Sequence, residues 1–291
     1  MLPLPLLFSV LALAAQEPPL PPSGIKAGSD RAVIDSPDGL FRWAEGESFV
    51  SVYRSGRAAA PGRIRLPSGP EPGGRRRLLF SPKAAFFGVL DEYTSEVGLH
   101  IDARQAPSKA KAAVIRSFLK LLDADGRILW GRRLPDKHAV GSPVGANSLR
   151  VSKNGVLAVL LQDTDPYATA RPLLLVIDGK GKDALRLDYT SFRRIEEFAL
   201  SADGAYLAVR GYGLVPEKET WGDALSIHRL GTRKYSVHAL SRSSEEHHLR
   251  LVRPDGWACC VKRGETFSSF RPDGSTERLT REKMLERLRE P

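Results

Sequence analysis

Residues Glu197–Val209 read EFALSADGAYLAV and decide our interpretation of the fold. An apolar strand, a Ser-Ala-Asp-Gly turn and a second apolar strand follow one another directly. Asp-Gly pairs tolerate the positive φ values that tight hairpin turns need, so this stretch predicts a β-hairpin.

The same pattern recurs along the chain. The other copies are Ala32–Ala44 (AVIDSPDGLFRWA), Arg77–Leu90 (RLLFSPKAAFFGVL), Ser148–Leu161 (SLRVSKNGVLAVLL) and His248–Val261 (HLRLVRPDGWACCV). The turns centre on Gly39, Ala84, Gly155, Gly204 and Gly256. The copy around Ala84 has no glycine and is degenerate. A recurring strand–turn–strand unit indicates a repeat architecture.

A second hairpin signal follows each copy, most clearly in Pro172–Tyr189, where an apolar run meets Asp178-Gly179. Two hairpins give four antiparallel strands in a repeat of about 45–50 residues, which is typical of a propeller blade. We predict an all-β fold, a β-propeller of about five four-stranded blades with a short C-terminal helix. A pair of β-sandwiches and a larger propeller completed by another chain remain alternatives.

Ser201–Val209 (SADGAYLAV) followed by Leu225–Leu240 (LSIHRLGTRKYSVHAL) resembles the repeats of WD40-like propellers. The closer resemblance is to the bacterial periplasmic type, as in the propeller domain of TolB, and it extends over nearly all of residues 28–280. The Gly-His and Trp-Asp dipeptides of true WD40 repeats are absent from the sequence. The resemblance therefore implies a propeller without choosing a family among propellers.

The N-terminus has the features of an export signal. Residues 1–16 carry no charge, and Ala12-Leu13-Ala14-Ala15 ends their apolar run with a small-residue cleavage site. We expect a signal peptide at 1–15, a Pro-rich linker at 16–27, the propeller at 28–280 and the C-terminal helix at 281–291. No later run reaches 18 apolar residues, so the sequence predicts no membrane-spanning helix. The protein is therefore expected to be secreted or periplasmic.

The charge of the chain limits the classes of partner that we expect, and its two cysteines limit the disulfides that it can form. The chain has 44 Lys and Arg against 34 Asp and Glu, a net charge of +10 that is spread over both halves and does not favour nucleic acid. The basic run Arg75-Arg76-Arg77 is interpreted as a solvated loop, with a polyanion contact as the alternative. Cys259-Cys260 is expected to lie in a strand with its side chains on opposite faces, and a vicinal disulfide is the alternative.

Long connections between the second and third strands of a blade are expected at 91–113, 163–172 and 211–223, where propellers place ligand-binding loops. They carry acidic and aromatic residues: Asp91, Glu92, Tyr93, Glu96, Asp163, Asp165, Tyr167, Tyr212, Glu217, Glu219, Trp221 and Asp223. Tyrosine and tryptophan are favoured at recognition surfaces. We therefore predict Tyr93, Tyr167, Tyr212 and Trp221 as ligand- or partner-binding residues, with ordinary solvated loops as the alternative.

Catalytic and metal-binding motifs are missing from the sequence. There is no His-Glu-x-x-His, no Gly-x-Ser-x-Gly and no phosphate-binding Gly-Lys-Ser/Thr loop, so we predict no catalytic residue, no metal ligand and no cofactor. His228 and His238 are expected to be structural.

We therefore predict a non-catalytic secreted or periplasmic propeller that binds a protein or cell-envelope ligand. A lactonase-like hydrolase with a central metal and a polyanion-binding protein are the alternatives. The helix at Thr280–Arg289 is expected to pack under the propeller, and docking of a partner through it is the other possibility.

Overall fold

In the part of the chain that it describes, the computed structural model shows β-strands followed by one helix. It describes residues 33–36, 40–53, 62–69, 74–82, 85–97, 112–135, 137–140, 148–161, 172–215, 219–240, 248–262 and 266–289. The predicted signal peptide (1–15) and linker (16–27) lie outside these ranges, as do the turns at Gly39 and Ala84.

The strands of the described ranges form five sheets. The first sheet contains β1 (Val33–Asp35), β2 (Phe41–Ala44), β3 (Phe49–Val52) and β4 (Gly62–Arg65). The second contains β5 (Arg75–Phe80), β6 (Phe86–Val97), β7 (Ala112–Asp123), β8 (Ile128–Arg133) and β9 (Lys137–Val140). The third contains β10 (Ser148–Val151), β11 (Leu157–Leu161), β12 (Leu173–Ile177) and β13 (Asp183–Leu187).

The fourth sheet contains β14 (Phe192–Leu200), β15 (Tyr206–Val215), β16 (Thr220–Arg229) and β17 (Tyr235–Ala239). The fifth contains β18 (His248–Val252), β19 (Ala258–Lys262), β20 (Thr266–Phe270) and β21 (Thr276–Leu279), and helix α2 (Arg281–Arg289) follows it. In each sheet, four strands that follow one another in sequence pair antiparallel, and β9 adds a short fifth strand to the second sheet by pairing with β7. The predicted β-propeller of about five four-stranded blades with a C-terminal helix is confirmed.

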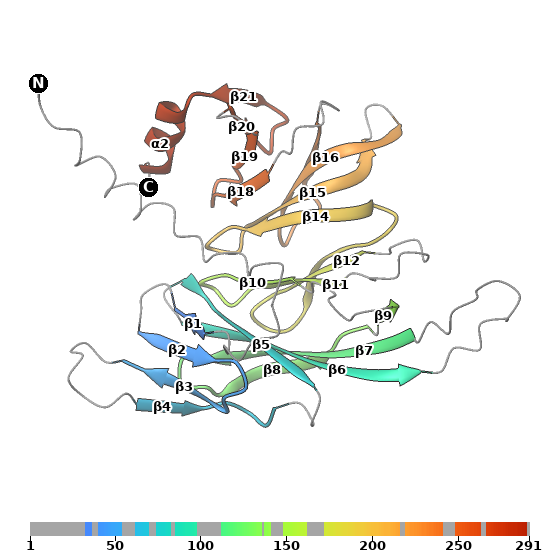
Figure 1. The fold of residues 1–291 in the computed structure, drawn as a ribbon. Coiled ribbons are helices and arrows are strands. Elements are labelled where there is room, and N and C mark those ends of the chain that lie inside the picture. Colours follow the sequence, from blue (N-terminus) through green and yellow to red (C-terminus); the bar gives the residue numbers. More distant parts are fainter. Residues whose placement is uncertain are drawn as a thin grey trace, which may run out of the picture.

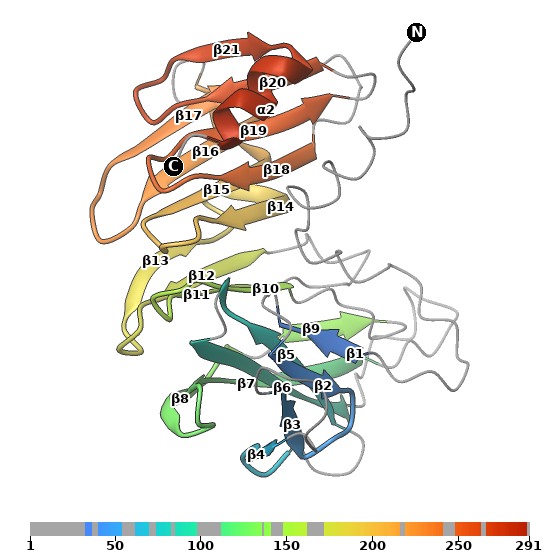
Figure 2. The same ribbon diagram turned by 90° about the vertical axis from the view of Figure 1, so that its left-hand side faces the viewer.

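The five sheets are stacked in chain order. Figure 1 shows the first sheet at the bottom and the last at the top, and Figure 2 shows the same order after a quarter turn. Buried apolar side chains fill the spaces between successive sheets, and every residue of β11 and β12 in the middle of the stack is buried. Burial on both faces explains why these two strands read as continuous apolar runs.

Because side chains alternate between the two faces of a strand, neighbouring residues pack in different cores. Cys260 packs between the fourth and fifth sheets, whereas Cys259 packs on the opposite face. Both cysteines are buried, as expected of two strand residues, and no disulfide joins them. Burial raises the pKa of Cys260 to about 12, which keeps its thiol protonated.

The serine of the repeated turn has a structural role in four of the five copies. Its hydroxyl accepts a hydrogen bond of 2.9–3.0 Å from the backbone N–H at the start of the next strand. These buried serines are Ser36, Ser81, Ser152 and Ser201. The bond closes the turn and satisfies a polar group that is cut off from water. In the fifth copy, Arg253 takes the place of the serine.

The two outer faces of the stack differ in what covers them. On the last sheet, Met284 of α2 packs with Trp257 and Leu279, so the helix covers the outer face of this sheet. The hydroxyl of Thr280 accepts a bond of 3.4 Å from the backbone N–H of Lys283 and begins the helix. The outer face of the first sheet is polar and carries the exposed Arg42–Asp35 ion pair. Such endings are typical of terminal repeats in a stack.

The structure corrects two predictions about loops. Arg75-Arg76-Arg77 begins strand β5 and is not a solvated loop. In the expected connection at 91–113, residues 91–97 belong to β6 and residues 112–113 to β7, and 98–111 lie outside the described residues. The expected connection at 211–223 is strand over 211–215 and 220–223, which belong to β15 and β16. Polar residues in these hairpins satisfy one another across the strands, so their polarity does not mark the end of a strand.

Candidate functional site

The β15–β16 hairpin brings two of the predicted binding residues together. In its register Leu214 lies opposite Trp221, and Tyr212 lies opposite Asp223, so all four side chains share one face. The rings of Tyr212 and Trp221 stack with centroids 6.4 Å apart and planes 24° from parallel. The predicted binding residues Tyr212 and Trp221 therefore form one surface, although they lie on strands rather than in a loop.

A guanidinium group extends this stack. The Cζ atom of Arg193 lies 4.4 Å from the ring centroid of Trp221 and 5.9 Å from that of Tyr189. A cation over an aromatic face is held by the ring quadrupole. We call the set formed by Tyr189, Arg193, Tyr212, Leu214 and Trp221 the aromatic platform.

The platform is open to solvent. Tyr212 and Trp221 are half-buried, Arg193 is exposed, and Leu214 is 41% exposed although it is a large apolar residue. Farther along the same face, Leu225 and Ile227 pack against the last sheet. The hairpin thus continues beyond the part that the last sheet covers, and the end of β15 and the start of β16 project to the side of the stack in Figure 1.

The end of the hairpin is conformationally constrained. Glu219, just before β16, has a φ of +47° and is the only non-glycine residue with positive φ in the described part of the chain. Gly213 and Gly222 face each other between the two platform pairs, and a Cβ at Gly213 would approach the ring of Phe192 to 2.7 Å. The close approach of Phe192 to the backbone fixes the position of the hairpin against β14.

The other predicted binding residues are placed elsewhere. Tyr93 lies on β6 in the second sheet and contacts Phe118 edge-on, with ring centroids 5.8 Å apart. It is therefore not part of the platform. Tyr167 lies outside the described residues, as do Asp163, Asp165 and Glu217.

Arg193, Tyr189 and Leu214 were missed by the sequence analysis. The pairing of β14 with β15 shifts register between Phe192 and Arg194, and Arg193 lies at this irregularity. A bulge of this kind re-aims a side chain, and the sequence around it carries no signal for it. Leu214 could have been identified from its alternation with Tyr212 once the segment was assigned to a strand.

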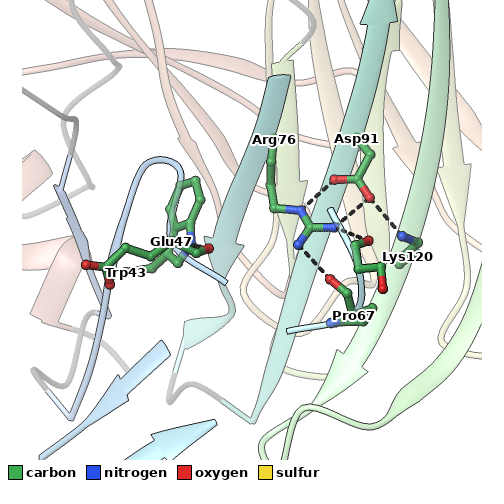
Figure 3. A network of polar contacts seen from close by, with 7 residues as sticks. Trp43, Glu47, Pro67, Arg76, Asp91 and Lys120 are labelled. Atoms are coloured by element: carbon green, nitrogen blue, oxygen red, sulfur yellow. Dashed lines mark hydrogen bonds and ion pairs between the residues drawn. The ribbon is translucent and has the colours of Figure 1, made fainter. Parts of the chain in front are cut away.

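Asp91, one of the acidic residues predicted in the first connection, serves the core instead. The carboxylate of Asp91 is fully buried and accepts bonds of 2.6 and 2.8 Å from Arg76 and one of 2.8 Å from Lys120. Arg76 also donates to the carbonyl oxygens of Pro67 and Ser68, which follow β4 (Figure 3). The beginning of β5 and the segment after the first sheet are thereby joined.

A second carboxylate, which is half-buried, joins the last two sheets. Glu197 of β14 accepts bonds from Arg210, from the Nδ1 atom of His248 and from the backbone N–H of Leu249. Burial opposes ionisation of Glu197, but the bonds from His248, Leu249 and Arg210 outweigh it and lower the pKa below its ordinary value. Glu197 therefore acts as a charged link between β14 and β18.

The two strand histidines have structural surroundings, as predicted. His228 is buried, contacts the hydroxyl of Ser226 at 2.9 Å and stacks on Tyr235 with centroids 5.5 Å apart. Burial lowers the pKa of His228 to about 4. His238 contacts the carbonyl oxygen of Arg271 at 3.1 Å. Among the residues described, no three His, Cys, Asp or Glu side chains come together as a metal site.

Comparison with known proteins finds similar solved structures only. No protein-family model and no curated protein matches the sequence. Similar solved structures include the Dos1 propeller, at 10% identity over 86% of this chain and 68% of that chain, with a TM-score of 0.41.

Two prokaryotic structures are similar as well. A putative TolB from Agrobacterium tumefaciens has 13% identity over 85% of this chain and 79% of that one, with a TM-score of 0.37. The β-propeller domain of the trilobed protease from Pyrococcus furiosus has 9% identity over 87% of this chain and 86% of that one, with a TM-score of 0.36.

Proposed function

We propose that this propeller is a non-catalytic binding protein and that the aromatic platform is its contact surface for a protein ligand. The observation that carries the proposal is the stack of Arg193, Trp221 and Tyr212 beside the exposed Leu214. Tryptophan, tyrosine and arginine are the residues most often found at energetic hot spots of interfaces. Their rings are already held in place by one another, so little side-chain freedom is lost on binding.

The chemistry of the platform defines what it would contact. Ring faces and Leu214 offer apolar area, and Arg193 offers N–H donors at the edge of the stack. A partner segment with an aromatic or aliphatic side chain beside a backbone carbonyl or carboxylate matches both. We place this partner at the cell envelope or outside the cell, because the apolar, uncharged N-terminus of the sequence resembles an export signal.

The lactonase-like alternative would need a group of metal-binding side chains, and the described residues contain none. The described part of the chain also holds no helix long and apolar enough to cross a membrane. A binding role therefore rests on the platform alone.

The test is capture of envelope proteins on the immobilised protein, followed by a Kd for the captured partner. Trp221→Ala is expected to weaken binding by at least about 30-fold, the loss typical of a hot-spot residue. Because Trp221 is only half-buried, the thermal midpoint should fall by no more than a few degrees.

Tyr235→Ala is the matched control. Tyr235 is also a stacked, exposed ring on the fourth sheet, but it pairs with His228 at the opposite end of β16 from Trp221. It should leave the Kd unchanged. Equal Kd values for the wild type and Trp221→Ala would reject the platform as the contact surface.

A further inference from the structure

The last sheet differs from the other four in its turns. Two of its turns carry the same tetrapeptide, Arg253-Pro254-Asp255-Gly256 between β18 and β19 and Arg271-Pro272-Asp273-Gly274 between β20 and β21. In an antiparallel sheet of four strands these two turns lie at the same end. They pack together, because a Cβ on Gly256 would lie 2.4 Å from Pro272 and 2.7 Å from the Tyr206 ring.

A cavity of about 440 Å³ lies beside the two turns. It is lined by the two turn arginines, Arg253 and Arg271, by Arg287 of α2, and by Trp257 and Tyr206. The first turn has an arginine where the other repeats have a buried serine, and this arginine donates through Nη1 to the carbonyl oxygen of Arg287. The exchange of serine for arginine thus joins the turn to the helix and leaves guanidinium groups around the cavity.

Two buried donors at this cavity have no acceptor in the described part of the chain. They are Nε1 of Trp257, a residue only 4% exposed, and Nη1 of Arg287. The other terminal nitrogen of Arg287 is held by Glu277 at 2.6 Å, and the Cζ atom of Arg287 lies 6.0 Å from the Trp257 ring centroid. A buried donor without an acceptor is costly, so two such donors on residues that line one cavity favour a ligand with oxygen acceptors.

The carboxylates at the rim are engaged with their own turns. Asp255 accepts a bond of 3.0 Å from the backbone N–H of Trp257. Asp273 accepts bonds of 2.8 and 2.6 Å from the N–H and hydroxyl of Ser275. One oxygen of each carboxylate, Oδ1, thus accepts bonds within its own turn. Arg253 is engaged as well, because its Nε atom lies 3.8 Å from Oδ1 of Asp255 and its Nη1 atom donates to the carbonyl oxygen of Arg287.

We propose that this cavity, the Arg-Pro-Asp-Gly cavity, binds an oxyanion group of a ligand, a carboxylate or a phosphate. Arg271 and the two donors on Trp257 and Arg287 supply the hydrogen bonds, and Arg253 fixes α2 against the turn. Hydrogen bonds from ionised donors to an oxyanion are stronger than neutral ones. The proposal does not depend on the aromatic platform, which belongs to the fourth sheet.

The test is a titration of the full chain with inorganic phosphate and, separately, with acetate, against sodium chloride of equal ionic strength. Calorimetry and tryptophan fluorescence report the Kd. Arg271→Gln removes an exposed side chain and should leave the fold intact. We expect it to weaken binding by about tenfold or more, as does the loss of a bond to a charged group.

Two further variants make the result specific. Trp257→Phe keeps an aromatic ring in the core, although a smaller one, and removes the N–H donor, and it should weaken binding about fivefold or more. Arg278→Gln removes the same charge from an exposed site on β21 and should bind as the wild type does. Stronger binding of phosphate or of acetate identifies the oxyanion. The proposal is wrong if neither anion binds, or if Arg271→Gln or Trp257→Phe binds as tightly as Arg278→Gln.

Discussion

Arg76 and Asp91 face each other across β5 and β6 and form two parallel hydrogen bonds, Nε to Oδ1 at 2.6 Å and Nη2 to Oδ2 at 2.8 Å. Asp91 is 0% exposed, and Lys120 supplies a second cation from β7 (Figure 3). With the carbonyl oxygens of Pro67 and Ser68 on the other side of the guanidinium, every terminal nitrogen of Arg76 has an acceptor. The network therefore satisfies its charges although it lies between the first two sheets.

Breaking this network should destabilise the protein strongly. Asp91→Asn leaves Arg76 buried without its counter-charge, and loss of one partner of a buried pair typically costs about 3–5 kcal/mol. The free energy of unfolding, measured by urea denaturation at pH 7.5, is expected to fall by that amount.

The Arg42–Asp35 pair provides the control. Its geometry is similar, with bonds of 2.6 and 3.1 Å, but the Asp35 side chain is 50% exposed. Asp35→Asn should cost less than about 1 kcal/mol, as exposed pairs do. Similar losses for the two variants would show that burial of Asp91 does not determine the strength of the pair.

The sequence predicts the hairpins well because their signals are local. In Ser201-Ala202-Asp203-Gly204 the serine hydroxyl, the Asp side chain and a glycine with φ of +74° all act within one turn. Five such turns were enough to predict the number of sheets and their antiparallel order.

The pairing of Arg76 with Asp91 was not predicted, because polar residues at the ends of long hairpins were assigned to loops. The correct register would have placed the two residues opposite each other. For the candidate site, Tyr212 and Trp221 were found from residue type alone. Arg193 was not, since its position depends on a register shift between β14 and β15.

His228 should make the protein sensitive to mild acid. Burial lowers its pKa to about 4, whereas the unfolded chain has a value near 6.5. Between these values the unfolded state binds a proton that the folded state does not, so stability is complete above pH 6.5 and falls as the pH decreases toward 4. At pH 5 the loss attributable to His228 is about 2 kcal/mol relative to pH 7.5.

This contribution can be isolated by comparing urea unfolding of the wild type and His228→Gln at pH 7.5 and 5. The variant should lose less stability between the two pH values, by about 2 kcal/mol. The lowered pKa of Glu197 acts below its ordinary value of 4.5, outside this interval. An identical pH dependence in both proteins would mean that His228 is protonated in the folded state.

Gly204 and Gly231 allow backbone strain to be separated from packing between sheets. Both have positive φ, +74° and +72°, so alanine at either position pays for a left-handed conformation, about 1–2 kcal/mol. A Cβ at Gly231 meets no atom within 4 Å. A Cβ at Gly204 would lie 2.7 Å from both Ser152 Oγ and Val156 Cγ2 of the third sheet.

Gly204→Ala should therefore cost about 1–3 kcal/mol more than Gly231→Ala, the usual range for overpacking. Urea unfolding of the two variants measures the difference directly. Because Ser152 also closes the turn of the third sheet through Val156, the clash should speed amide hydrogen exchange at Val156 in Gly204→Ala but not in Gly231→Ala. Equal stabilities and unchanged exchange would show that the third and fourth sheets adjust at this contact without cost, and that the glycine is needed there only for its backbone angle.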